Sequence, residues 1–174
     1  THRSVTEPQR TVFYSHGGGF VFGSTRTHRK LAEQLSRACR ARVVLYDYRL
    51  ATVADVDALL ADGEAVYRWT AARYPDQPLV VAGDSAGGNM TITLLARIAA
   101  DSLPSPVAGV GISAWLDPDL QHRRGEPCDP FFSAAFATKA AALCLPGAGI
   151  RPLLGTLPAI PMLLQCGADE PIRP

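Results

Sequence analysis

Apolar positions along the chain form two kinds of segment, short continuous runs and longer stretches with helical spacing. The short runs, rich in β-branched and aromatic residues, predict five buried strands at 11–15, 42–48, 79–82, 107–113 and 162–166. The longer stretches predict helices at 28–40, 56–70, 86–100 and 131–144. Buried strands that alternate with amphipathic helices are typical of an α/β fold, a mostly parallel sheet covered by helices on both faces.

One segment, 118–160, departs from this alternation. It holds six of the fourteen prolines, at positions 118, 127, 130, 146, 152 and 158, and only one predicted helix. We interpret residues 1–174 as a single α/β core from which 118–160 is an irregular excursion. No internal repeat or low-complexity segment argues for a second domain.

The composition fits one ordered domain and excludes several classes of partner. Of the 174 residues, 47% are apolar and 19% are charged, which is enough to build a core. A formal net charge of +1 gives no electrostatic case for nucleic-acid binding or for an anionic membrane. No apolar run reaches the ~20 residues of a membrane span, and the polar N-terminal stretch does not resemble a signal peptide.

The four cysteines are widely spaced and form no CxxC pair. They stand at positions 39, 128, 144 and 166. We interpret them as reduced core residues of a cytoplasmic protein, in preference to disulfides or a zinc site.

Residues 83–87 read GDSAG, a G-x-S-x-G pattern between a predicted strand and a predicted helix. In that context the pattern is typical of a nucleophile elbow, a turn so sharp that small residues must flank the serine. The hydroxyl of Ser85 would then lie at a helix N-terminus, where the dipole and free N–H groups favour developing negative charge. The alternative is a glycine-rich turn that only allows close packing.

A second glycine motif, HGGGF at 16–20, follows the first predicted strand. Its glycines allow backbone N–H groups to turn toward the oxygen of a tetrahedral intermediate, and the N–H of Ala86 can join them. A phosphate-binding loop is the competing interpretation. It fails because no GxxxxGK[ST] pattern follows and no acidic residue is placed to bind a ribose.

Together with DYRLA at 47–51, these motifs resemble the hormone-sensitive-lipase-type carboxylesterases of the α/β-hydrolase superfamily. The similarity continues through WLD at 115–117, DPF at 129–131 and GADE at 167–170. It implies the α/β-hydrolase fold, Ser85 as the nucleophile, and Gly18, Gly19 and Ala86 as oxyanion-hole donors. It implies a structural role for His16, and no metal or cofactor.

The resemblance places the triad acid after the last predicted strand, where two carboxylates compete. Glu170 is followed by Pro-Ile-Arg and matches the family pattern, while Asp169, one residue earlier, is the alternative. The family's catalytic histidine comes after the acid, and this sequence has none there. Of the histidines present, His2 lies in a polar terminus, His28 at a helix start in a solvated or capping role, and His122 in a polar run.

The family also has further strands on both sides of the segment represented here, and Thr52 stands where its YRLAP motif has proline. We therefore expect 1–174 to be a partial core, truncated at both ends, whose two bare sheet edges invite pairing or aggregation. A fragment of a longer esterase is the favoured explanation. A naturally eroded, catalytically silent hydrolase and a chain completed by a partner are the alternatives.

The sequence does not indicate the oligomeric state. It does fit two functions of different classes. The favoured one is a serine carboxylic-ester hydrolase acting through an acyl-serine on a small apolar ester, because Phe20, Phe22 and Trp115 flank the motifs. The alternative is a catalytically incomplete hydrolase-like protein that binds a small molecule, as the gibberellin receptors that resemble these esterases do. The intact Ser85 and glycine motif favour the enzyme.

Overall fold

The computed structural model describes residues 6–116, 134–144 and 155–167, and its centre is a five-stranded sheet. All neighbouring strands are parallel, in the order β2-β1-β3-β4-β5. The strands are β1 (Arg10–Ser15), β2 (Ala41–Leu45), β3 (Leu79–Asp84), β4 (Ala108–Ile112) and β5 (Met162–Gln165). The five predicted strands are therefore confirmed.

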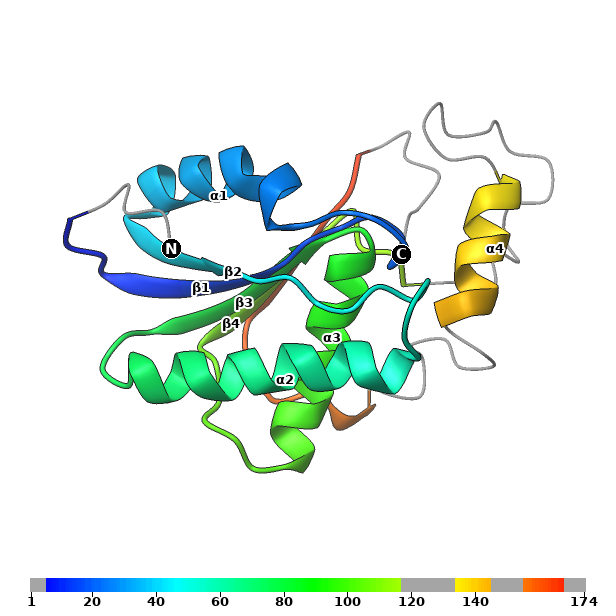
Figure 1. Cartoon of the computed structure of the whole chain (residues 1–174). Coiled ribbons are helices and arrows are strands. Elements are labelled where there is room, and N and C mark those ends of the chain that lie inside the picture. Colours follow the sequence, from blue (N-terminus) through cyan, green and yellow to red (C-terminus); the bar gives the residue numbers. More distant parts are fainter. Residues whose placement is uncertain (1–5, 117–133, 145–154, 168–174) are drawn as a thin grey trace.

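Helices cover both faces of this sheet, as Figure 1 shows. Helix α1 (Thr25–Cys39) lies on one face, and α2 (Val56–Arg73) and α3 (Ala86–Ala100) lie on the other. Helix α4 (Ala134–Cys144), within the predicted excursion, stands beyond the carboxyl ends of the strands. The rest of 118–160, apart from residues 155–160, falls outside the described residues.

The alternation of side chains along β1 explains why the sheet needs both helical layers. Val12 and Tyr14 belong to the core on the α1 side, where Leu31 and Leu35 of α1 pack. Phe13 points to the opposite face and stacks on Tyr46, with ring centroids 4.8 Å apart. A strand with apolar side chains on both faces is stable only when both faces are covered.

Several elements differ in extent from the sequence prediction, and for α1 and β2 the difference has a local cause. Helix α1 begins three residues early because Ser24 caps it, accepting from the Thr27 N–H while the Thr27 hydroxyl donates back to the Ser24 carbonyl. Strand β2 ends at Leu45, before the predicted limit of 48. The Asp47 and Tyr48 side chains leave the sheet and contact neighbouring elements described below.

The prediction of core cysteines is wrong for the two whose side chains the structure describes. Cys39 and Cys166 are free thiols, but both are exposed, at the end of α1 and just after β5. Helical spacing placed Cys39 on the apolar side of α1, yet Cys39 is the last residue of the helix, and the chain turns at Arg40 into β2. Cys128 and the side chain of Cys144 lie outside the described residues.

One edge of the sheet presents apolar side chains to solvent. On β5, Met162, Leu163 and Leu164 are 36%, 56% and 45% exposed.

No helix in the part of the chain that the structure describes is long and apolar enough to cross a bilayer.

Candidate active site

Ser85 lies at the sharp turn between β3 and α3, half-buried and directly before the first helical residue. Its backbone has φ 52° and ψ −119°, a conformation that a side chain makes unfavourable. Three hydrogen bonds hold it there: its N–H donates to the Ile112 carbonyl at 2.9 Å, and its carbonyl accepts from Asn89 and Trp115 N–H groups at 3.1 and 2.9 Å. The neighbouring strand and the helix therefore fix the serine in this strained geometry.

The glycines on either side of Ser85 are required by close approach of backbone to backbone. A Cβ on Gly83 would lie 2.2 Å from the Gly87 carbonyl oxygen, and one on Gly87 would lie 2.1 Å from the Ser15 carbonyl oxygen. Helix α3 thus starts in direct contact with the end of β1. This contact brings the nucleophile elbow, residues 83–87, against the loop that follows β1.

That loop, residues 16–19, is called the glycine loop here, and it adopts conformations that favour glycine. Gly18 has φ 129° and Gly19 has φ 58°, and a Cβ on Gly18 would lie 2.1 Å from the Phe22 carbonyl oxygen. The Gly18 carbonyl accepts from the Val21 and Phe22 N–H groups at 3.1 and 3.0 Å. Ala86 is the first residue of α3, and a first-turn N–H has no acceptor within its own helix.

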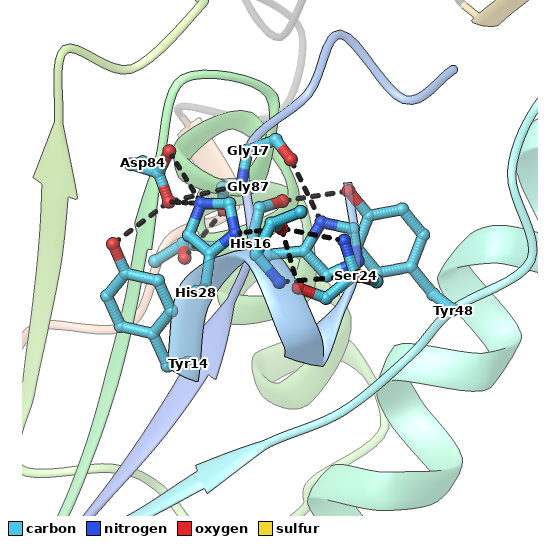
Figure 2. A network of polar contacts seen from close by, with 10 residues as sticks. Tyr14, His16, Gly17, Ser24, His28, Tyr48, Asp84 and Gly87 are labelled. Carbon is cyan, nitrogen blue, oxygen red and sulfur yellow. Dashed lines mark hydrogen bonds and ion pairs between the residues drawn. The ribbon is translucent and has the colours of Figure 1, made fainter. Parts of the chain in front are cut away.

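The carboxylate of Asp84 joins the glycine loop to the elbow (Figure 2). Its Oδ1 accepts from the Gly17 N–H at 3.0 Å and from the Tyr14 hydroxyl at 2.9 Å. The Nε2 atom of His28 lies 3.3 Å from Oδ1 and 3.4 Å from Oδ2. We call these four residues the Asp84 network.

The ionisation of the Asp84 network follows from burial and pairing. Burial would raise the pKa of Asp84, but the hydrogen bond and charge of His28, with those from Tyr14 and Gly17, bring it below its ordinary value. The same hydrogen bond raises the pKa of His28. Burial, helped by the charge of Asp84, raises the pKa of the Tyr14 hydroxyl, which therefore stays protonated and donates. The arrangement therefore favours the carboxylate form of Asp84 and the imidazolium form of His28.

The expected solvated or capping role of His28 is wrong. Ser24 caps α1, and the His28 side chain is only 18% exposed, turned toward Asp84. Its other ring nitrogen, Nδ1, lies 2.8 Å from the Thr27 hydroxyl. The helix begins earlier than predicted, so His28 falls within its first turns and faces the sheet.

His16 is buried beneath the glycine loop. Its ring stacks on Tyr48 with centroids 4.2 Å apart, and Nδ1 lies 2.9 Å from the Gly17 carbonyl oxygen. Burial lowers the pKa of His16 below its ordinary value. In this position the imidazole supports the loop from below.

The DYRLA motif ties the surroundings of the site together. The Asp47 carboxylate accepts from the Thr25 N–H and hydroxyl at the start of α1, at 2.6 and 3.0 Å. The Tyr48 hydroxyl donates to the His16 carbonyl at 2.8 Å. Arg49 forms an ion pair with Asp62 of α2 at 2.8 Å. Three consecutive side chains thereby connect β2 to α1, to the glycine loop and to α2.

The aromatic residues expected to flank the substrate divide into core and surface. Phe20 and Trp115 are 2% and 4% exposed, so they belong to the core, whereas Phe22 is 47% exposed. Phe22 lies near Phe136 of α4, with ring centroids 6.1 Å apart. A Cβ on Gly19 would lie 3.4 Å from the Phe136 ring and 3.8 Å from the Cβ of Ala140, also on α4. Helix α4 therefore packs over the glycine loop.

Several predicted site residues lie outside the described residues. These are the two candidate acids, Glu170 and Asp169, and the histidines His2 and His122. The Asp84 network, in turn, was missed by sequence reasoning. Asp84 itself could have indicated the network, because a carboxylate at the end of a buried strand is normally paired with hydrogen-bond donors or a positive charge.

Comparison with known proteins agrees with this geometry. A family model described as the alpha/beta hydrolase fold matches residues 12–173. The chain belongs to the α/β-hydrolase family. It is 34% identical to versiconal hemiacetal acetate esterase of Aspergillus parasiticus over 110 aligned residues. These residues cover 63% of this chain and 35% of that protein. It is 30% identical over 178 residues to an acetyl-hydrolase of Streptomyces hygroscopicus, 97% of this chain and 60% of that protein.

Solved structures narrow the assignment within the family. An esterase from the bacterial hormone-sensitive lipase family superposes with a TM-score of 0.83 at 32% identity, covering 95% of this chain and 59% of that chain. The resemblance to hormone-sensitive-lipase-type carboxylesterases is therefore confirmed, as is the α/β-hydrolase fold. The chain spans between about a third and three fifths of the length of these curated relatives.

Proposed function

We propose that the chain carries the nucleophile and the oxyanion hole of a serine carboxylic-ester hydrolase. The observation that supports this most is the strained Ser85 at the start of α3, with the glycine loop bonded through Gly17 to the residue directly before it. A protein that only binds a ligand has no physical need for a serine held at φ 52° and ψ −119° at the start of a helix. The strain is understandable if the serine hydroxyl must be presented to a substrate.

In the proposed reaction the Oγ of Ser85 attacks the acyl carbon of an ester and loses its proton to a base. The N–H groups of Gly18, Gly19 and Ala86 stabilise the oxygen of the tetrahedral intermediate. Collapse of the intermediate breaks the bond to the alcohol, which leaves with the proton and gives an acyl-serine. Water then attacks the acyl-serine, releasing the acid and restoring the hydroxyl.

Neither histidine in the described part of the chain suits the role of the base. Both ring nitrogens of His28 face other groups, Asp84 and the Thr27 hydroxyl, and His16 is buried beneath the loop. We assign proton transfer to a histidine outside the described residues, either His122 or one beyond this sequence. Glu170 is our first choice for the acid that orients it, and Asp169 our second.

The names of two relatives suggest where to look for a substrate. One is an acetyl-hydrolase and the other an acetate esterase, so a short acyl group on an uncharged alcohol is the class we propose. Exposed apolar surface from Phe22, beside Phe136, lies next to the glycine loop and suits such an ester.

The free thiols of Cys39 and Cys166 suit a reducing, cytoplasmic compartment, which we include in the proposal.

The nucleophile is tested by labelling with a fluorophosphonate probe and by hydrolysis of p-nitrophenyl acetate. Labelling and turnover should both be lost in Ser85→Ala. Ser102→Ala is a matched control, because Ser102 is exposed and also has positive φ, 52°, and it should leave both unchanged. Labelling that survives Ser85→Ala would refute the nucleophile. Loss of both turnover and labelling in His122→Ala, with the fold retained, would identify His122 as the base.

The acid is tested by comparing Glu170→Gln with Asp169→Asn. The acid fixes the tautomer of the histidine and stabilises the imidazolium, a role worth roughly 10⁴ in kcat in comparable triads. Glu170→Gln should therefore lower kcat by orders of magnitude more than Asp169→Asn. The reverse order would place the acid one residue earlier.

A further inference from the structure

The Asp84 network brings together three elements that are far apart in sequence, and its central residue touches neither the substrate nor the oxyanion in the proposed reaction. We propose that His28 is a positioning residue, which acts through Asp84 to set the separation between the glycine loop and Ser85. This inference rests on the proposed function and adds a residue to it.

The covalent connections make the network a direct link between the two halves of the site. Asp84 immediately precedes the nucleophile, and Gly17 immediately precedes the first proposed oxyanion donor, Gly18. The bond from the Gly17 N–H to Asp84 Oδ1, at 3.0 Å, therefore sets the position of the donor relative to Ser85. A Cβ on Gly17 would lie 2.2 Å from Asp84 Oδ2, so loop and carboxylate are in contact as well as bonded.

A single hydrogen bond leaves a carboxylate free to rotate, and the other two partners remove this freedom. The Tyr14 hydroxyl, from β1, holds Oδ1 at 2.9 Å. His28 approaches from α1 and contacts both oxygens, at 3.3 and 3.4 Å. Figure 2 shows the contacts of Asp84 with the phenol of Tyr14, the imidazole of His28 and the loop at Gly17. The carboxylate plane is thus set by β1 and α1 together.

His28 is itself held in place by the elements around it. Its Nδ1 lies 2.8 Å from the Thr27 hydroxyl, and Asp47 anchors Thr25 at the start of the same helix. Besides Asp84, the titratable groups near His28 are Tyr14, His16 and Asp47. Asp84 supplies the dominant favourable interaction with the His28 imidazolium, and the His28 pKa is raised accordingly.

The first experiment separates positioning from binding, by measuring fluorophosphonate labelling of Ser85 over a range of probe concentrations. In His28→Leu the maximal labelling rate should fall about tenfold, while the half-saturating concentration stays within about twofold, because a displaced donor weakens only the transition state. His28→Gln, which keeps an N–H donor near the Nε2 position, should recover most of the rate. Arg37→Leu, a matched change on α1 that breaks an exposed ion pair, should have no effect.

A double-mutant cycle tests whether His28 acts through Asp84. Asp84→Asn should slow labelling, and adding His28→Leu to it should slow labelling by much less than tenfold, because coupled residues are not additive. Full multiplication of the two effects would overturn the proposal. So would a loss of rate in His28→Leu that His28→Gln does not recover at all.

A third measurement needs no activity and separates failure of this inference from failure of the proposed function. Amide hydrogen exchange at Gly17 should be faster in His28→Leu than in the wild-type chain and Arg37→Leu, because the acceptor of that N–H is no longer fixed. If wild-type Ser85 is not labelled but exchange changes as expected, the proposed function fails and the network stands. Unchanged exchange at Gly17 would overturn the network.

Discussion

Replacing Gly87 with alanine should test how tightly the elbow is built. The added Cβ would lie 2.1 Å from the Ser15 carbonyl oxygen and 2.7 Å from that of His16, both in the backbone. Relief of this contact needs a shift of about 1 Å between α3 and β1. Overpacking of this severity costs about 3 kcal/mol, offset by about 1 kcal/mol from the better helix propensity of alanine. We expect a net loss of about 2 kcal/mol.

The same shift should affect chemistry more than stability. A displacement of about 1 Å between Ser85 and the glycine loop can slow the reaction about 100-fold. Urea unfolding and the rate of fluorophosphonate labelling would measure the two effects. The control is Gly155→Ala, because a Cβ there has no heavy atom within 4 Å, so stability should change by less than about 0.5 kcal/mol. Wild-type stability and labelling in Gly87→Ala would refute this account of the elbow.

Three further predictions concern strain, pH and the open sheet edge. Ser85→Gly should be about 1 kcal/mol more stable than Ser85→Ala in urea, because glycine tolerates φ 52°. Hydrogen bonding to Asp84 raises the pKa of His28, so the stability advantage of wild type over His28→Gln should be full below pH 6.5, as long as Asp84 stays ionised, and should shrink as pH rises through the folded-state pKa of His28. The pKa of His16 is lowered by burial in both chains and also by the charge of His28 in the wild type, so His16 adds a contribution of opposite sign to this difference. Leu163→Lys on the exposed edge strand should reduce aggregation measured by light scattering, whereas aggregation equal to wild type would exclude β5 as its cause.

The sheet and its helices could be predicted from the sequence because the strands are short apolar runs that alternate with stretches of helical spacing. A continuous apolar run such as that of β3 has one simple explanation in an α/β chain, and the elbow after it follows from the glycine spacing. Helix α3 was predicted at its observed bounds because a strand and a proline enclose it. The start of α1 was less predictable, because capping by Ser24 depends on a reciprocal bond with Thr27.

The Asp84 network could not be predicted, because nothing in the local sequence connects its members. His28 and Asp84 are 56 positions apart, and their contact depends on how α1 lies across the sheet. The exposure of Cys39 was missed for a related reason, since helical periodicity does not show how far along a helix its apolar face is covered. Patterns along the chain indicate which face of a helix is buried. They do not indicate which polar group of another element contacts a side chain at the edge of that face.

The network also changes the interpretation of the three motifs that pointed to this family. In the sequence they were separate signals, a glycine loop, a DYRLA turn and a G-x-S-x-G elbow. In the structure Asp84 of the third bonds Gly17 of the first, and Tyr48 of the second supports His16 beneath it. A change in any of them should therefore alter the same quantity, the separation of Ser85 from the oxyanion donors. In this chain the three motifs form one hydrogen-bonded unit.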